Sequence, residues 1–598
     1  MLLLTNLHHP LSNCSPFVPP SDHNCQTSAH VDISTPVAAP QELTADMFTH
    51  VDPVVVIIPC HSAQKDSNLS SCFNPLPCGV ISPINIDILR LFLSDHPDQS
   101  LVKFLLNGFT HGFDIGYRGP VTQGQTRNLL SARENIPHVT EAIRKELSRG
   151  HTAGPFSQPP FDTLHCSPLG AVPKKDGTYR IILDLSSPRG SSINEFISST
   201  DFSVRYSSFD DAVQLVSDIG PSCVLAKLDI KHAFRLCPVR PSDWPLLGYQ
   251  WLDGFFIDTR LPFGSRSSPF IFNKFADALL WILTTVFNIT FMVHYLDDFL
   301  ICNVSHAKCK EDMDCMQSVF SQLGVPLAPD KVIGPSTCLT YLGIEIDSHN
   351  QSIRLPPDKL ADLITLLHSW SAKKKCTKRE LLSLLGSLSF ACKVVKPGRM
   401  FLRRLIDLST TVHHINHRIT LNTEARADIT WWITFLPTWN GKELIQSAPV
   451  TSYSKKLFTD ASLLGFGSVY NNQWFSKKWP APYKDYHINF LELFAIVASV
   501  FTWGHDWANQ QILFYTDNLC ITNVWRSGTC INKDIMRLVR ALFYFTAKNN
   551  INILMHHIPG QTNTLADLLS RLQVDRFHRL HPSAESIPTP ISPDVWLI

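Results

Sequence analysis

Paired cysteines are missing from this chain of 598 residues. Its 16 cysteines are scattered, with no CxxC pair among them, which argues against a zinc knuckle and a disulfide framework. We therefore expect buried, reduced thiols in an intracellular protein of the cytoplasm or nucleus that is not secreted. The start, MLLLTNLHHP, lacks a charged segment followed by a clean apolar one, and predicts no signal peptide.

The chain also lacks an excess of charge and long apolar runs. Its 52 lysines and arginines against 51 acids give a net charge of +1, which argues neither for nor against a nucleic-acid partner. We find no run of about 18 apolar residues and expect no membrane contact. Basic residues are almost absent from the beginning, where Lys65 is the only lysine or arginine before Arg90.

Composition and periodicity divide the chain into six segments. The first is rich in Pro, Ser, Thr and Asn and is expected to be disordered, as is a short Pro-rich tail at the other end. Between them the patterns alternate between helical and strand-like. The expected segments are disorder over 1–84, a helical N-terminal extension over 85–159, strands and helices over 160–350, helices and a turn-rich linker over 351–455, a second α/β block over 456–572, and the disordered tail over 573–598.

The sharpest motif is FMVHYLDDFLIC, residues 291–302, in which two apolar runs flank Asp297 and Asp298. This pattern predicts a strand–turn–strand hairpin with paired carboxylates at its tip. A solvated turn is the alternative, because Asp favours turns. Two adjacent acids among apolar strands are costly to bury unless a cation neutralises them, and Mg²⁺ prefers such oxygen ligands.

A second strand-like run supplies a third acid. VLAKLDIKHAF, residues 224–234, contains Asp229. On a neighbouring strand, Asp229 would join Asp297 and Asp298 in holding two divalent ions, the arrangement that nucleotidyl transfer uses.

Between these runs lies RLPFGSRSSPFIFNKF, residues 260–275. Gly264 allows close backbone approach, and Ser268 and Pro269 predict the N-cap and first position of a helix. A helix start beside a loop suits a nucleotide or template contact, with Gly264 as a nucleotide-binding residue. Core packing explains the apolar face of the helix equally well.

Together these motifs resemble the palm of reverse transcriptases. LDIKHAF resembles the first aspartate motif of that family, LPFGSRSSP its template-and-nucleotide motif, YLDD its signature hairpin, and YLGIEID (341–347) its primer grip. The resemblance spans about 172–347 and implies a right-hand polymerase. Fingers and palm would cover 160–350, and a thumb and connection 351–455. It also implies two Mg²⁺ ions per active site, with Mn²⁺ as the alternative ion.

The same resemblance assigns nucleotide contacts. VPKKDGTYRIILDLS, residues 172–186, is similar to the fingers segment that holds the incoming triphosphate, and Lys175 and Arg180 match its basic residues. Lys331 in LAPDKV matches the lysine near the triphosphate. Phe234 matches the aromatic residue that blocks a ribose 2′-hydroxyl and selects deoxynucleotides; core packing is the alternative for this ring.

Basic residues gather in the predicted helices that follow. Residues 373–404 hold ten lysines and arginines against one acid, Glu380. Phosphate contacts from such a segment would give sequence-independent affinity for nucleic acid. A solvated helix face is the alternative.

Four further acids lie in otherwise apolar elements of the block 456–572. They follow the order strand, helix, strand, helix: Asp460, Glu492, Asp517 and Asp567. Converging carboxylates would repel one another without cations, and two Mg²⁺ ions would resolve that repulsion and make an RNA-cutting site. The order resembles ribonuclease H, which implies that these acids are catalytic metal ligands. His557, or alternatively His556, would then assist product release or proton transfer.

The order polymerase, connection, ribonuclease H resembles that of retrotransposon polyproteins. HIPGQTNTLADLLSR and GFTHGFDIGYRGP (108–120) are most similar to DIRS-type (tyrosine-recombinase) elements; gypsy-like LTR elements, which share LPFG, are the alternative. No DTG or DSG protease motif, zinc-knuckle capsid motif or HHCC integrase pattern is found. Any integration activity is therefore expected to come from another chain or to have been lost, and capsid-like, recombinase or integrase proteins of the element are candidate partners.

The sequence thus predicts an α+β multidomain enzyme, an RNA-directed DNA polymerase with RNA–DNA hybrid ribonuclease H activity. Its partners would be an RNA template, a DNA primer, the hybrid and deoxynucleoside triphosphates. The alternatives are a non-catalytic nucleic-acid-binding remnant and a protein in which ribonuclease H alone is active. The presence of all seven acids argues against the remnant.

Overall fold

The computed structural model describes residues 73–438, 443–444 and 456–598, apart from residues 122, 175, 176, 509, 529 and 550. Most of the predicted disordered segment 1–84 and most of the predicted linker lie outside the described residues. The end of the first segment is ordered, contrary to the prediction, because Asn74 exchanges two backbone hydrogen bonds with Gly154 and Ile84 is buried.

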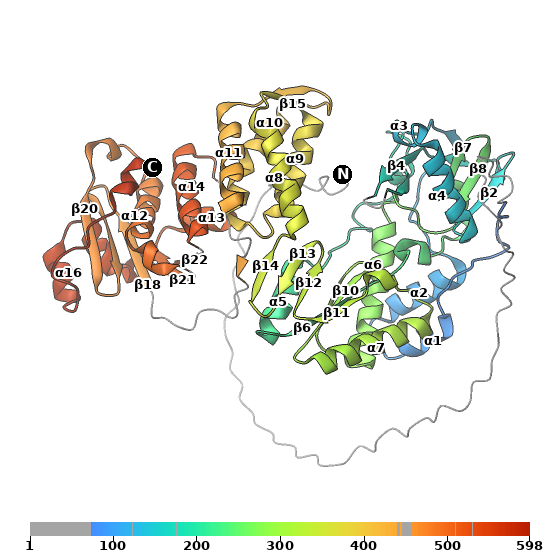
Figure 1. The fold of residues 1–598 in the computed structure, drawn as a ribbon, viewed down its shortest axis with the longest axis horizontal. Helices are drawn as coiled ribbons and strands as arrows, with labels where there is room; N and C mark the ends of the chain where they lie inside the picture. The colour runs from blue at the N-terminus through green and yellow to red at the C-terminus, as the bar shows by residue number, and fades with distance from the viewer. Residues whose placement is uncertain are drawn as a thin grey trace, which may run out of the picture. The chain divides into compact units, whose positions relative to one another are not determined.

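A four-stranded sheet of order β11-β6-β10-β9 carries the first group of acids. β6 is buried along nearly its whole length, because the helices α5 and α7 pack against the sheet (Figure 1). The elements are α5 (Phe209–Ile219), β6 (Val224–Asp229), β9 (Met292–Tyr295), β10 (Asp298–Asn303), α7 (His306–Leu323) and β11 (Ile333–Ser336).

The predicted hairpin of residues 291–302 is confirmed. β9 and β10 pair antiparallel with Tyr295 opposite Asp298, which leaves Leu296 and Asp297 as a two-residue turn. Leu296 has a φ of 53°, in the left-handed region that residues other than glycine seldom adopt. Strained backbone of this kind concentrates at functional sites, and here it supports a turn that carries a candidate acid.

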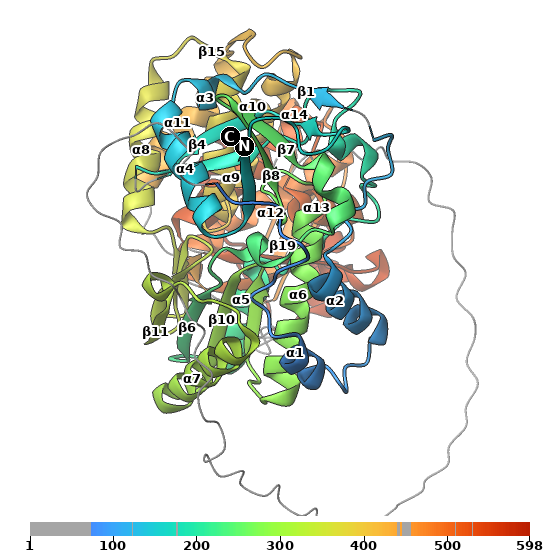
Figure 2. The ribbon, with the colours of Figure 1, turned by 90° about the vertical axis from the view of Figure 1, so that its right-hand side faces the viewer.

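The helices predicted over 85–159 are present, but they do not form a separate extension. Their apolar side chains belong to the same core as β6 and α6 (Ser268–Trp281), because α2 buries a stripe of Val102, Leu105 and Phe109. Figure 2 shows α1 and α2 beside α6. The helices are α1 (Ile86–Phe92), α2 (Gln99–His111), α3 (Leu130–Arg133) and α4 (Ile136–Ser148).

The stretch 108–120 has a structural role in this core. Arg240 places Nη1 2.8 Å from Oδ2 of Asp114 and Nε 3.0 Å from Oδ1 of Asp243. The backbone N–H of Ile115 donates to Oδ2 of Asp243 at 3.1 Å. The motif therefore ties the N-terminal helices to the 3-10 helix Pro241–Leu246.

Two further sheets contact α4, one through β2 and the other through β5. A five-stranded sheet has the order β1-β3-β7-β8-β2, and β4 and β5 form a separate pair. Their strands are β1 (Gly124–Gln125), β2 (Thr152–Phe156), β3 (His165–Cys166), β4 (Leu169–Pro173), β5 (Tyr179–Leu183), β7 (Gly248–Trp251) and β8 (Gly254–Asp258).

The start of α6 lies one residue earlier than predicted. Ser267 is the N-cap and Ser268 the first helical residue, because the Ser268 hydroxyl donates to the carbonyl oxygen of Pro262 at 2.9 Å and does not cap. Gly264 has a φ of 124°, and a Cβ there would lie 2.0 Å from the carbonyl oxygen of Leu183. The predicted close backbone approach is confirmed.

The segment from 338 to 438 is a small sheet followed by helices. Helices were predicted over 351–455 and are present, but short strands also lie in that range. Thr377 and Glu380 form a capping box at the start of α9, which fixes where that helix begins. The elements are β12 (Cys338–Tyr341), β13 (Ile344–Asp347), β14 (Ser352–Arg354), α8 (Pro357–Ser371), β15 (Lys375–Thr377), α9 (Lys378–Ala391), α10 (Arg403–Thr410), β16 (Arg418–Thr420) and α11 (Thr423–Thr438), and β17 (Glu443–Leu444) pairs with β14.

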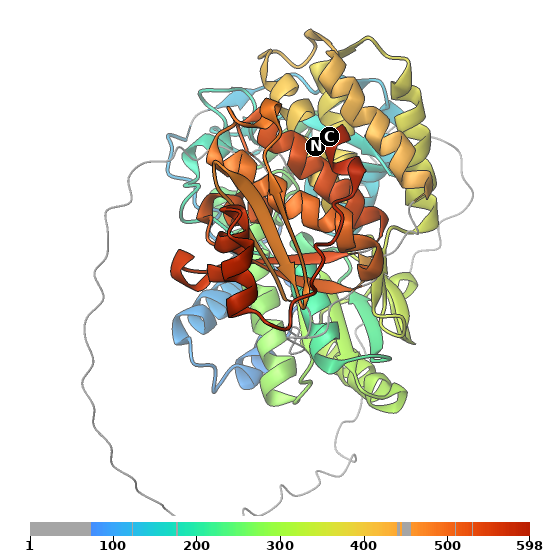
Figure 3. The same cartoon turned by 90° about the vertical axis from the view of Figure 1, so that its left-hand side faces the viewer.

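The C-terminal block is a five-stranded mixed sheet of order β20-β19-β18-β21-β22, drawn in orange in Figure 3. α12 and α15 pack against β18 and β19. A turn at Asn471–Asn472 joins β19 to β20. The elements are β18 (Lys456–Ala461), β19 (Gly465–Tyr470), β20 (Gln473–Lys478), α12 (Ile488–Trp503), β21 (Gln511–Thr516), α13 (Leu519–Ser527), α14 (Lys533–Lys548), β22 (Asn552–His557) and α15 (Thr564–Ser570).

The prediction of a disordered tail over 573–598 is wrong. This segment forms α16 (Val574–Leu580) and a final 3-10 turn, Pro593–Leu597. Val595 is fully buried, and the ring of Trp596 lies 5.3 Å from that of Phe494 in α12. The prediction relied on the Pro-rich composition of the segment. It failed because a few large side chains of the segment pack against the C-terminal block.

The expectation that no segment is apolar enough to cross a membrane also needs correction. Two helical stretches of the described residues, Ser268–Val286 and Ile488–Trp507, have the length and composition to do so. Half of the first and 72% of the second are buried inside the protein, and the second carries Glu492. Burial in the core accounts for their apolar composition.

Candidate active sites

The first site gathers three carboxylates where β6 and β10 meet. In the antiparallel register Asp298 lies directly opposite Asp229. The backbone N–H of Ile230 donates to the carbonyl oxygen of Asp297 at 2.9 Å. Strand pairing therefore brings together all three acids that the sequence singles out for this site.

Two lysines lie against these acids. Lys331 places Nζ 2.9 Å and 3.0 Å from the two carboxylate oxygens of Asp229. Lys227, on the same face of β6 as Asp229, places Nζ 2.9 Å from Oδ1 of Asp298. Sequence reasoning missed Lys227, because its partner is decided by strand register, although its place two residues before Asp229 was a signal.

Burial and mutual repulsion raise the pKa values of two of the acids. Burial raises the pKa of Asp297 to about 6, and the charges of Asp229 and Asp298 add to the rise. Burial also raises the pKa of Asp229, although the hydrogen bond from Lys331 opposes it. The lysines thus compensate the negative charge only in part.

The donor set of this site fits a hard divalent cation. Lys227 is within ion-pair distance of Oδ1 of Asp298, yet no well-aligned hydrogen bond from a described residue reaches that buried oxygen. Three carboxylates this close together repel one another unless cations neutralise them. Mg²⁺ or Mn²⁺ prefers such oxygen ligands, and Asp229, Asp297 and Asp298 are the residues that would hold it.

Two of the predicted nucleotide-binding residues lie close together near this site. The guanidinium carbon of Arg180 lies 5.2 Å from the centre of the Phe263 ring, and that ring lies 5.3 Å from the ring of Phe234. Phe234 is only partly buried, so core packing does not enclose it. The predicted residue Lys175 lies outside the described residues.

The predicted primer-grip hairpin reaches the same acids. β12 and β13 pair antiparallel with Tyr341 opposite Ile344. The Tyr341 hydroxyl donates to the carbonyl oxygen of Asp298 at 3.2 Å. Residues 341–347 are therefore fixed to the strand that carries the paired acids.

The second site lies at the carboxyl ends of β18 and β21. These parallel neighbours end at the same edge of the sheet, with Asp460 near the end of β18 and Asp517 directly after β21. Glu492 comes from α12, which packs on β18. Carboxylate oxygens of Asp460, Glu492 and Asp517 lie within 4.8 Å of one another.

This cluster carries strongly raised pKa values. Burial raises the pKa of Glu492 to about 9, and the charges of Asp460 and Asp517 add to the rise. Burial raises the pKa of Asp460 to about 6. Oε2 of Glu492 and Oδ1 of Asp517 are buried and receive no hydrogen bond from any described residue. These oxygens fit a divalent cation, which would supply the missing partner.

The fourth predicted acid stands apart from the other three. The side chain of Asp567 is 38% exposed and pairs with Nε of Arg571 at 2.8 Å. Its charge still contributes to the raised pKa of Asp460, so it lies near the cluster without belonging to it.

Of the two candidate histidines, His557 contacts the site. Its Nε2 lies 3.1 Å from the carbonyl oxygen of Asp517, whereas the ring of His556 lies 6.2 Å from that of Tyr515. Gly560 is a residue that sequence reasoning missed: a Cβ there would lie 2.9 Å from Oδ2 of Asp517. Its place in the motif HIPGQTNTLADLLSR was the available signal.

The raised pKa of Glu492 predicts pH-dependent binding of Mg²⁺. Because its pKa is raised, the protonated Glu492 carboxyl stabilises the metal-free folded state. This contribution to stability is complete below the unfolded-state pKa of about 4.5 and is lost as the pH rises towards about 9. Binding must displace this proton. Calorimetric titration should therefore show tighter Mg²⁺ binding at about pH 9 than at about pH 6, by roughly tenfold per pH unit for one released proton.

The variant Glu492→Gln isolates this effect. It cannot release the proton, so its remaining Mg²⁺ binding should depend much less on pH. Equal pH dependence in wild type and Glu492→Gln would contradict the assignment of this proton to Glu492.

The acids of the first site stand on β6 and on the β9–β10 hairpin, which lie within residues 224–303. Residues 172–346 match the family model of the reverse transcriptase (RNA-dependent DNA polymerase). The chain therefore contains a reverse transcriptase domain.

Two groups of known proteins are similar to the chain over a longer range. The Tf2-3 and Tf2-4 transposon polyproteins of Schizosaccharomyces pombe are each 24% identical over 464 residues, which cover 73% of this chain and 31% of the polyprotein. The chain thus spans about a third of the length of these curated relatives. A foamy viral protease-reverse transcriptase in complex with dsDNA has 16% identity and a TM-score of 0.46, with 81% of this chain and 100% of that chain covered. The same viral protein in complex with an RNA/DNA hybrid has 15% identity and a TM-score of 0.43, with coverages of 81% and 64%.

Proposed function

We propose that the chain is an RNA-directed DNA polymerase of a retrotransposon that also cleaves the RNA strand of RNA–DNA hybrids. The observation that supports the polymerase activity is the register of β6 and β10, which sets Asp229 opposite Asp298. Asp297 lies beside them in the turn whose strained residue is Leu296. The match of residues 172–346 to the reverse transcriptase family supports it. The acid cluster of the C-terminal block carries the proposed ribonuclease H.

In the polymerase site, Asp229, Asp297 and Asp298 would hold two divalent ions, Mg²⁺ or Mn²⁺. When bound, these ions neutralise charge on the attacking and leaving oxygens of nucleotidyl transfer. Lys331, now paired with Asp229, is free to turn towards a triphosphate once a cation replaces it. Its side chain is 54% exposed, which leaves room for that movement.

In the ribonuclease H site, Asp460, Glu492 and Asp517 would hold the ions, and Asp567 would complete the set by leaving Arg571. Both partners of that pair are at least a third exposed, so the pair is weak. His557, fixed by its contact with the Asp517 carbonyl, would assist proton transfer or product release. Contacts to the ribose 2′-hydroxyl would distinguish the RNA strand from DNA.

Primer extension tests the proposal most directly. A DNA primer on a labelled RNA template is incubated with deoxynucleotides, with and without Mg²⁺, and both strands are followed. Metal-dependent extension with shortening of the RNA is the expected result. Hybrid binding without either reaction would identify a non-catalytic remnant, and shortening without extension would identify an active ribonuclease H alone.

Removal of the Phe234 ring should relax the choice of sugar. In Phe234→Ala the ratio of kcat/KM for a deoxynucleotide over the matching ribonucleotide is expected to fall about a hundredfold, because a steric filter is lost. The control Phe234→Tyr keeps the ring and should keep the ratio. A lower Tm with an unchanged ratio in Phe234→Ala would reduce Phe234 to a packing residue.

We also infer a DIRS-type element as the source, from HIPGQTNTLADLLSR and the stretch 108–120; a gypsy-like element is the alternative. The similarity to transposon polyproteins supports a retrotransposon and is compatible with both. The partners would be an RNA template, a DNA primer, the hybrid, deoxynucleoside triphosphates, and capsid-like, recombinase or integrase proteins of the element. Its place would be the cytoplasm or nucleus.

A further inference from the structure

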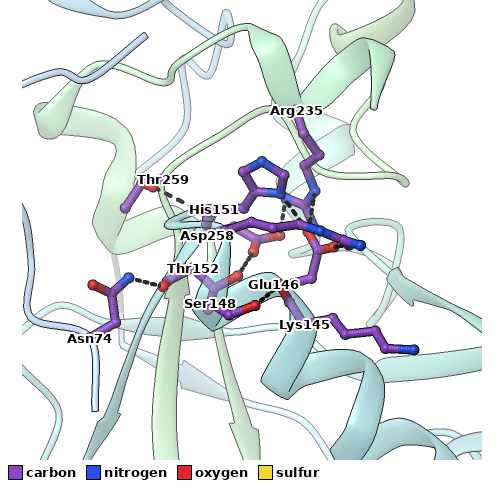
Figure 4. Close-up of polar contacts among 10 residues, drawn as sticks. Asn74, Lys145, Glu146, Ser148, His151, Thr152, Arg235, Asp258 and Thr259 are labelled. Atoms are coloured by element: carbon purple, nitrogen blue, oxygen red, sulfur yellow. Dashed lines mark hydrogen bonds and ion pairs between the residues drawn. The ribbon is translucent and has the colours of Figure 1, made fainter. Parts of the chain in front are cut away.

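A buried ion cluster lies directly behind the turn that carries Phe234. Arg235 follows Phe234 in the 3-10 turn η3 (Ala233–Leu236). Its Nε lies 3.1 Å from Oε2 of Glu146 in α4, and its Nη1 lies 2.9 Å from Oδ2 of Asp258 in β8 (Figure 4). The side chain of Arg235 is only 10% exposed. One guanidinium therefore ties η3 to a helix and to a strand.

Further contacts hold each carboxylate in place. Glu146 also lies 3.0 Å from Nδ1 of His151, and Thr152 donates to Oδ1 of Asp258 at 2.7 Å; Figure 4 shows both contacts. Burial alone would raise the pKa of Glu146, but Arg235 and His151 outweigh it and lower that pKa to about 2. Glu146 is therefore charged throughout the working pH range and cannot release Arg235 by protonation.

A different side of the turn packs against aromatic rings. Three residues complete one turn of a 3-10 helix, so neighbouring side chains point about 120° apart. Phe234 lies against Phe263 and Phe272, with ring centres 5.3 Å and 5.7 Å away, while Arg235 points to the ion cluster. His232, which opens the turn, has a φ of 61°. This backbone conformation persists only where its surroundings enforce it.

We propose that Arg235 is a positioning residue that fixes the Phe234 ring and so sets the selectivity for deoxynucleoside over ribonucleoside triphosphates. The proposal rests on the polymerase activity proposed above. A buried ion pair contributes little net stability compared with apolar side chains of the same volume, so stability alone does not account for the cluster. The guanidinium instead ties the turn to two carboxylates at once by ion pairs, Nε to Glu146 and Nη1 to Asp258.

The test compares sugar selectivity in two variants that weaken the cluster. Arg235→Lys keeps the charge, but an ammonium is a point charge without the planar guanidinium fork that meets both carboxylates. Asp258→Asn removes one partner and leaves Arg235 in place. In both, the ratio of kcat/KM for a deoxynucleotide over its ribonucleotide should fall about tenfold, because a small displacement of a positioning element has effects of this order. If Arg235→Lys does not fold, Asp258→Asn carries the test.

Arg149→Gln is the matched control. Arg149 pairs with the same Glu146 at 3.1 Å, but it is 39% exposed and lies outside η3. Its removal should leave the ratio unchanged. In the Phe234→Ala background, Arg235→Lys should have no further effect on the ratio, because no ring remains to be positioned.

Each outcome decides between distinct conclusions. Wild-type selectivity in folded Arg235→Lys and Asp258→Asn overturns the inference, as does an equal loss in Arg149→Gln. A further loss in the Phe234→Ala background would mean that Arg235 acts by another route. A wild-type protein that extends no primer overturns the proposed function instead, and is recognised before any variant is measured.

Discussion

Asp297→Asn is expected to abolish DNA synthesis and to leave RNA cleavage intact. Asn has the shape of Asp but carries no charge, so the site loses a ligand that would hold the catalytic cations. Removing such a ligand should lower kcat by at least about a thousandfold, or about 4 kcal/mol of transition-state stabilisation. Extension and cleavage are measured in the same tube.

The electrostatics of the site provide a check on folding. The pKa of Asp297 is raised by burial and by its acidic neighbours, so a neutral side chain relieves repulsion in the metal-free protein. Asp297→Asn should therefore melt at the same temperature as the wild type or higher. Asp253→Asn, in the exposed β7–β8 turn, is the control and should keep both activities. Near-normal synthesis by Asp297→Asn would refute the assigned role.

Asp517→Asn should have the reverse effect. Its carboxylate meets Asp460 and Glu492, and its Oδ1 is a buried oxygen without a partner among the described residues. Loss of this ligand should reduce cleavage of the RNA strand by at least about a thousandfold and leave primer extension unchanged. The readout is gel analysis of labelled RNA in a preformed hybrid.

Asp575→Asn is the matched control for this variant. Asp575 lies in α16 of the same block and is exposed, so its neutralisation should affect neither reaction. If a folded Asp517→Asn protein lost DNA synthesis as well, the two sites would not be independent, and the division of labour proposed here would be wrong.

Local pattern was enough to predict the elements that carry the acids. The hairpin of 291–302, the strand ending at Asp229 and the helix of Glu492 each combine an apolar run with one or two acids, and such runs are legible without knowledge of partners. The order of Asp460, Glu492, Asp517 and Asp567 in otherwise apolar elements, and its resemblance to ribonuclease H, predict that these four acids converge. The structure brings the first three together and leaves Asp567 outside the group.

Features decided by long-range pairing could not be predicted. Lys227 meets Asp298 only because of the register of two distant strands. The partners of Arg235 come from α4 and β8, and neither has a sequence signature. The C-terminal segment was misjudged for a related reason: its composition is that of a disordered tail, whereas Val595 and Trp596 pack into a core formed by residues far earlier in the chain.

That same C-terminal segment lies along the exposed edge of the β20–β22 sheet. β20 is an edge strand, and edge strands present unpaired backbone groups that can recruit another chain. Here the backbone N–H of Thr589 donates to the carbonyl oxygen of Trp474, and that of Glu585 to Asn472, both at 2.8 Å. Residues 585–589 thus occupy positions beside β20 that a second copy would need for strand-to-strand association.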